Sequence, residues 1–226
     1  MAFRREELTL TYLRIEATFP PVERFSGTTL PELNLAICQS HNLEGYHISG
    51  DAGAHFYTEG EKDIEIDRSS ISIEEHVRKS IELLKREFSD ILSIVQKQLS
   101  VNAFFGPDYT LRALWPLGTQ VGQGIQRAVN IHDDQLRLLK TDVEGIGFVI
   151  FGSDGDAEPT SHSRLRLQPY LADPDQLFIE YNKHSHDIVE TPAVIEQGIQ
   201  DAYDTLTKNV SAFIESLGLD GGGSHA

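Results

Sequence analysis

The chain carries a similar pattern of residues at two positions. Residues 13–20 read Leu-Arg-Ile-Glu-Ala-Thr-Phe-Pro and residues 111–116 read Leu-Arg-Ala-Leu-Trp-Pro, and each run is followed by a turn and a helix-like stretch. Because proline has no amide hydrogen to donate, we expect each run to form a strand that ends at its proline. The pattern predicts two similar halves, about residues 8–100 and 101–217, within a single domain over residues 1–217.

The spacing of apolar residues predicts the elements of each half. Residues 72–99 carry apolar side chains three and four positions apart, which predicts an amphipathic helix, and residues 192–217 repeat this spacing. Outside these two segments, alternation such as that around Ile64 and Ile66 predicts antiparallel strands. We therefore expect an α+β fold of duplicated strand–helix–strands–helix halves, with a curved antiparallel sheet packed by two long helices. The glycine-rich residues 218–226 are expected to be a disordered tail.

The charge of the chain limits its partners. Acidic residues outnumber basic ones by 35 to 19, which gives a formal net charge of −16. Such a surface repels nucleic acid and anionic lipid, because binding either depends on cations that displace counterions. There is no run of about 18 apolar residues that would cross a membrane, and no apolar stretch follows Arg4 and Arg5 as in a secretory signal. We expect a cytoplasmic protein with neither nucleic acid nor membrane as partner.

The usual sequence signatures of catalysis are not found. Cys38 is the single cysteine, so an internal disulfide and a thiolate metal cluster are both excluded. The glycine-rich residues 118–124 lack the lysine and hydroxyl residue of a phosphate-binding loop and the spacing of a dinucleotide fingerprint. We therefore expect no cofactor and favour a non-enzymatic binding or regulatory protein. Its partner would be another protein or a small ligand, and a homodimer stays open.

Two histidine-containing segments support an alternative, a metal-dependent hydrolase. The first joins His132 to Asp133, a pair of residue types that can hold a divalent metal. The second contains His184 and His186 and resembles the HxHxD motif of metallo-β-lactamase-like hydrolases, although its aspartate comes one residue too early. On a strand these two histidines would face the same side, which would permit a metal site. The competing interpretation places the first segment at a helix start or turn and the second in a polar loop at the end of a strand.

Two further groups of residues are candidates for a binding site. A cavity between sheet and helices would be lined by aromatic side chains, unless these simply fill the core. Arginines within strands either face solvent, pair with a carboxylate such as Glu180, or line an anion-binding groove on the concave side of the sheet. The proposed pocket residues are Phe56, Arg112, Trp115, Phe148 and Phe178, and the other strand arginines are Arg14 and Arg166.

The run from Leu13 to Pro20, the Arg112-centred strand and the helix from Tyr203 to Phe213 resemble a sporadically distributed family of bacterial proteins often found near defence or restriction genes. That family has no assigned activity, so the resemblance implies none. The doubled layout is also similar to TATA-binding-protein-like, helix-grip folds, in which a curved antiparallel sheet grips long helices. This chain departs from the DNA-binding member in two ways. It lacks a basic concave surface, and no pair of phenylalanines in it can be matched to the pair that intercalates into DNA. The resemblance therefore implies the fold without that mode of DNA binding.

Overall fold

Two antiparallel strands, β1 (Thr9–Thr18) and β6 (Phe104–Pro116), form the centre of the fold. Their side chains alternate between the two faces of the sheet, as the period of a strand requires. Leu13 and Ile15 of β1 and Leu111 of β6 are buried on one face. The fold was obtained as a computed structural model, which describes residues 7–22, 25, 29–48, 53–117, 121–140, 145–155 and 158–219.

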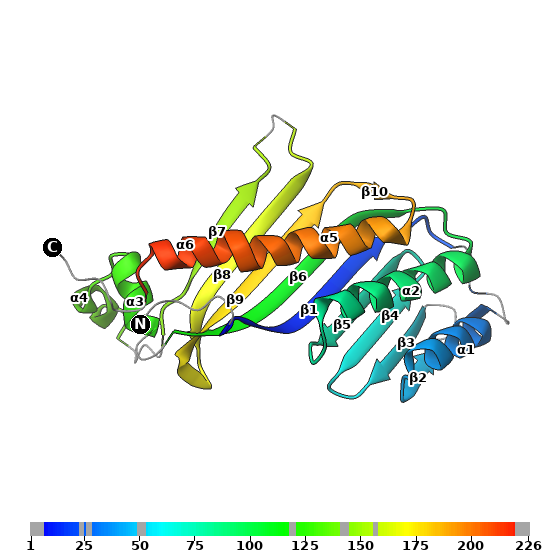
Figure 1. Cartoon of the computed structure of the whole chain (residues 1–226), viewed down its shortest axis with the longest axis horizontal. Helices are drawn as coiled ribbons and strands as arrows, with labels where there is room; N and C mark the ends of the chain where they lie inside the picture. Colours follow the sequence, from blue (N-terminus) through cyan, green and yellow to red (C-terminus); the bar gives the residue numbers. More distant parts are fainter. Residues whose placement is uncertain are drawn as a thin grey trace.

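The described strands form one antiparallel sheet, as predicted (Figure 1). Its order is β2-β3-β4-β5-β1-β6-β9-β8-β7, and β10 pairs with β6 in addition. The register of β1 with β6 shifts between Leu10 and Tyr12, which matches the change in alternation within residues 8–19. The remaining strands are β2 (Gly45–Ile48), β3 (Gly53–Thr58), β4 (Lys62–Asp67), β5 (Ser70–His76), β7 (Phe148–Ser153), β8 (Ser161–Tyr170), β9 (Asp173–Ser185) and β10 (Ile188–Val189).

Helices cover one face of this sheet, while the other face carries none of the described helices (Figure 1). On the covered face, α2 and α5 pack against each other, and their apolar side chains join those of the strands in one continuous core. No described helix is long and apolar enough to cross a membrane. The helices are α1 (Thr29–His41), α2 (Ile81–Leu99), α3 (Val121–Ala128), α4 (Asp133–Arg137), α5 (Pro192–Asp204), the π-helix η2 (Thr205–Val210) and α6 (Ser211–Ser216).

The structure changes the boundaries of the two predicted amphipathic helices. The first begins at Ile81 rather than near residue 72, because residues 70–76 form β5 between β1 and β4. Ile71 and Ile73 are two residues apart, which is the period of a strand, so residues 72–76 were wrongly assigned to the helix. The second is divided by η2, in which the hydroxyl group of Thr207 donates to the carbonyl of Tyr203, and the hydroxyl group of Ser211, the first residue of α6, donates to the carbonyl of Thr207.

The segment after the last helix begins with ordered residues. Gly218 adopts a positive φ of 62°, which glycine accepts readily at a helix end. Leu219 is buried, and its backbone lies against Gly124 of α3. The other residues of the predicted tail, 220–226, lie outside the described residues.

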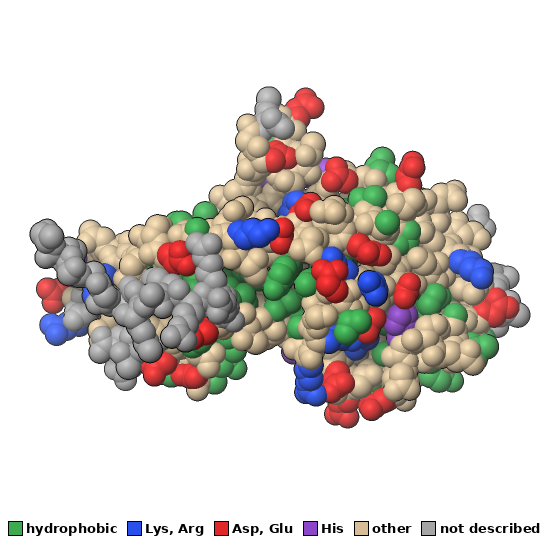
Figure 2. All heavy atoms as spheres, in the orientation of Figure 1, with side chains coloured by type: hydrophobic (Ala, Val, Ile, Leu, Met, Phe, Trp, Pro, Cys, Tyr) green, Lys and Arg blue, Asp and Glu red, His purple; other side chains and the backbone are tan. Residues whose placement is uncertain are grey.

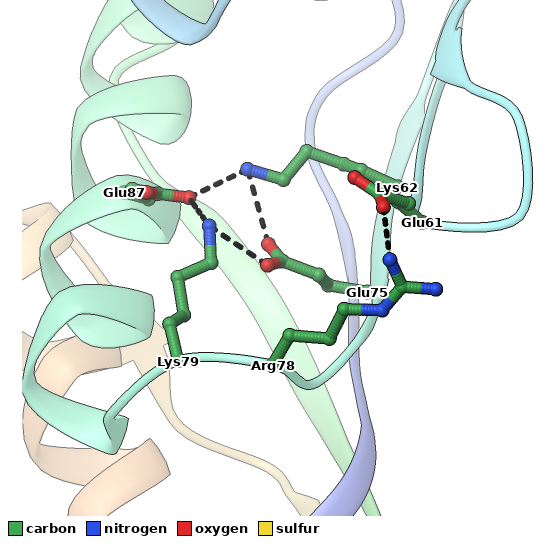
Figure 3. Close-up of polar contacts among 6 residues, drawn as sticks. All are labelled: Glu61, Lys62, Glu75, Arg78, Lys79 and Glu87. Carbon is green, nitrogen blue, oxygen red and sulfur yellow. Dashed lines mark hydrogen bonds and ion pairs between the residues drawn. The ribbon is translucent and has the colours of Figure 1, made fainter.

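A ring of four charges links α2 to the sheet (Figure 3). Lys62 Nζ lies 3.0 Å from Glu75 Oε2 and 2.6 Å from Glu87 Oε2. Lys79 Nζ lies 2.8 Å from Glu75 Oε1 and 2.6 Å from Glu87 Oε2. Lys62 and Glu75 are buried, so each charge depends on its partners in the ring for compensation. The two lysines balance the two glutamates, which indicates a structural role.

Glu75→Gln should lower the free energy of unfolding by about 3 kcal/mol, because it leaves a buried lysine without full compensation. The matched control is Glu61→Gln, which removes the exposed ion pair between Glu61 and Arg78 beside the ring (Figure 3) and should cost less than about 1 kcal/mol. Urea unfolding at pH 7 measures both changes. Equal losses in the two variants would contradict a special contribution from the ring.

The ring should also make stability depend on pH. Burial, the largest single influence, raises the pKa of Glu87, but hydrogen bonds from Lys62 and Lys79 outweigh it and hold this pKa below its usual value. The stabilisation is therefore present above the unfolded-state pKa of about 4.3 and is lost as the pH falls below it. Glu87→Gln should make the free energy of unfolding less dependent on pH between about 4.5 and 3. An unchanged slope in urea unfolding across this range would contradict the prediction.

Candidate functional site

The helix-free face of the sheet carries a polar groove of about 640 Å³. Strand register arranges most of its lining residues in three rows that cross β1, β6, β9 and β8, with about 6.6 Å between rows because alternate residues share a face. In strand order, the first row is Tyr12, Arg112, Glu180 and Arg166, the second is Arg14, Thr110, Asn182 and Arg164, and the third is Glu16, Asp108, His184 and His162.

A buried carboxylate, Glu180, orients two of the arginines. It is only 5% exposed. Its Oε2 accepts a hydrogen bond from Arg112 Nε at 2.8 Å, and its Oε1 accepts one from Arg164 Nη2 at 2.9 Å. Both arginine side chains remain about half-exposed toward the groove. Because a guanidinium has five N–H donors, each arginine keeps further donors beyond this contact.

The aromatic ring of Tyr12 contacts the guanidinium group of Arg112. The guanidinium carbon of Arg112 lies 4.3 Å from the centre of the ring, a cation–π contact. The Tyr12 hydroxyl donates to Glu74 on β5. Burial and this hydrogen bond raise the pKa of Tyr12 well above its usual value, so the hydroxyl stays protonated as a donor. Arg112 is therefore held both by a carboxylate and by a fixed ring.

The other residues of the second row also have polar partners. Asn182 Nδ2 donates to Thr110 Oγ1 at 2.9 Å. Arg14 donates from Nε to Ser72 Oγ at 3.0 Å, and its Nη2 lies 2.8 Å from Glu16 Oε2 in the third row. The charge of Arg14 is therefore compensated within the groove.

Histidines gather at the third row. His184 Nδ1 lies 3.1 Å from Asp108 Oδ2. The His186 ring contacts those of His184 and His162 edge-on, with centroids 4.8 and 5.4 Å apart. No group of three or more His, Cys, Asp or Glu side chains among the described residues has an arrangement that could hold a metal ion.

The residues of the proposed hydrolase are not brought together. His132 precedes α4, where its backbone N–H donates to Gln135 Oε1 at 2.7 Å, and it lines a separate depression with residues of α3. The side chain of Asp133 lies outside the described residues. α3 packs near Pro169 of β8, which pairs with Leu177 of β9. His184 lies seven residues further along β9 than Leu177, or about 23 Å away from it. The two histidine segments thus occupy different ends of the sheet.

The predicted aromatic pocket is divided between the two faces. Phe56 and Trp115 are fully buried in the core on the helix-covered face, and Phe148 is partly buried against that core. Arg112 and Phe178 lie on the other face, opposite Glu180 and Leu114 in the strand register. Arg112 is therefore the predicted pocket residue that lines the groove.

Sequence reasoning found only part of this site. It identified Arg14, Arg112 and Arg166 as strand arginines but overlooked Arg164 and His162. The available signal was alternation on β8, where His162, Arg164 and Arg166 occupy every second position and Leu165 and Leu167, on the other face, are buried. The chain was expected to lack a basic concave surface, and on the helix-free face four arginines line the groove together with three carboxylates. On the helix-covered face, acidic and basic side chains are interspersed (Figure 2).

Comparison of the chain with protein-family models and with curated proteins finds no match.

Proposed function

We propose that this chain is a non-enzymatic binding protein that holds a small anionic ligand in the groove on the helix-free face of the sheet. The observation that carries the proposal is the buried Glu180, which holds Arg112 and Arg164 side by side. A guanidinium presents paired N–H donors whose geometry suits carboxylates and phosphates. The groove volume of about 640 Å³ also falls within the range typical of small-molecule sites.

Pre-orientation supports binding at this position. A free arginine side chain loses about 2 kcal/mol of rotamer entropy when it is fixed. The hydrogen bonds to Glu180 and the contact of Arg112 with Tyr12 fix these side chains before a ligand arrives. Ligand binding therefore causes a smaller loss of side-chain entropy, which increases the affinity for the ligand. Cation donors fixed in this way hold an anion and supply no nucleophile, so binding is favoured over catalysis.

We infer that the groove lies within a duplicated fold of the helix-grip type, with one domain formed by two halves. The first half runs β1, α1, β2 to β5, α2, and the second runs β6, α3, α4, β7 to β10, α5. This shared order supports duplication, and the adjacency of β1 and β6 joins the halves at the centre of the sheet. On this view α2 is one long helix, and the run from α5 to α6 is the other. The groove then draws most of its lining from the second half.

Arg164→Gln should weaken the binding of an anionic ligand at least about tenfold, because it removes one of the two oriented guanidiniums. The measurement is a thermal-shift survey of small carboxylates and phosphates, followed by calorimetric titration of those that raise the unfolding temperature. The control is Arg78→Gln, which removes an exposed cation that pairs with Glu61 and does not line the groove, and it should leave affinity unchanged. Ligands that bind Arg164→Gln and the unmodified protein equally would contradict the proposed site.

A further inference from the structure

The distribution of charge within the groove distinguishes between classes of anion. Around Glu180, the first two rows bring together three arginines, Arg112, Arg164 and Arg166. Arg112 and Arg164 share this one carboxylate. Arg166 donates from Nε to the uncharged side chain of Gln168 at 2.9 Å and forms no ion pair with the residues that the structure describes. Among the described residues that line this end of the groove, three positive charges against one negative charge leave an excess of two.

The rest of the groove has no such excess. The charge of Arg14 is balanced by Glu16, 2.8 Å away. Asp108 faces His184 at 3.1 Å. The positive excess is therefore local to the Glu180 end, and the third row adds two carboxylates about two rows away from it.

Resting on the proposed function, we propose that the ligand is a small phosphate monoester whose phosphate group lies among Arg112, Arg164 and Arg166. A phosphate monoester has a second pKa of about 6 and is mostly a dianion at neutral pH, which matches the excess of two charges. A carboxylate, a sulfate ester and a phosphodiester each carry a single negative charge. The three terminal oxygens of the monoester can accept several hydrogen bonds. Arg112 and Arg164 can supply them from the N–H groups that do not bond Glu180.

The third row disfavours a polyanion. A nucleic-acid strand that followed the groove would bring successive phosphates over Glu16 and Asp108 as well as over the arginines. Like charges at this separation repel, and the chain as a whole carries −16. A small monoester places its one phosphate among the arginines and directs its uncharged part toward Thr110, Asn182 and the third row. The groove thus selects a single dianion over a chain of monoanions.

Calorimetric titration at pH 7.5 and constant ionic strength tests this proposal with three probes of similar shape: phenyl phosphate, phenyl sulfate and benzoate. Phenyl phosphate should bind at least about tenfold more tightly than the other two, because it alone carries two charges at this pH. Arg166→Gln should reduce this preference to less than about threefold, because it removes one of the two excess charges. Arg78→Gln, which alters an exposed cation paired with Glu61, serves as the control and should preserve the preference. Thermal unfolding of each variant verifies that it is folded.

The outcomes separate this inference from the proposed function. If phenyl sulfate or benzoate binds as tightly as phenyl phosphate and all depend on Arg164, the groove is an anion site but the monoester assignment is wrong. If no probe responds to substitution of any of the three arginines, the proposed function fails as well. A single-stranded oligonucleotide or a phosphoserine peptide that binds more tightly than phenyl phosphate would overturn the assignment to a small molecule.

Discussion

The pairing of β1 with β6 is the constraint on which the rest of the structure depends. These strands lie at the centre of the sheet, so their register determines which residues share a face on either side of them. Leu13 and Leu111 lie opposite each other in the core, while Arg14 and Thr110 lie opposite each other in the groove. A slip of one residue would exchange the two sets. The hydrophobic core thus fixes the positions of the polar groups on the other face.

The two faces of the sheet differ in how fully carboxylates compensate the cationic side chains. On the helix-covered face, Lys62 and Lys79 meet two glutamates, and the ring is closed and neutral. On the helix-free face, Glu180 is shared by two arginines, with a third nearby that bonds an uncharged glutamine. Burial makes full compensation necessary in the first case, whereas partial exposure permits an excess in the second. An open cluster of this kind is what an anionic ligand requires.

Local patterns predicted much of the fold, but they did not place strands beside one another. Alternation and helical spacing identified the antiparallel sheet and most of α2, and failed at residues 70–76, where one short alternating run continues almost directly into a helix. Gly106 and Pro107 are residue types typical of turns, yet they lie within β6, where Gly106 takes a positive φ of 55°. Local composition indicates a turn there, and pairing with β1 and β10 overrides it.

The groove was harder to predict because its residues come from four strands that are distant in the sequence. The usable signal was whether two residues of one strand are an odd or an even number of positions apart. Arg112 and Trp115 differ by an odd number of positions on one strand, so they face opposite sides and cannot line one pocket. The same rule places Arg112 with Thr110 and Asp108, but only the register with β9 brings Glu180 beside it. This long-range pairing converts an exposed strand arginine into an oriented one, and the proposed anion-binding site depends on this step.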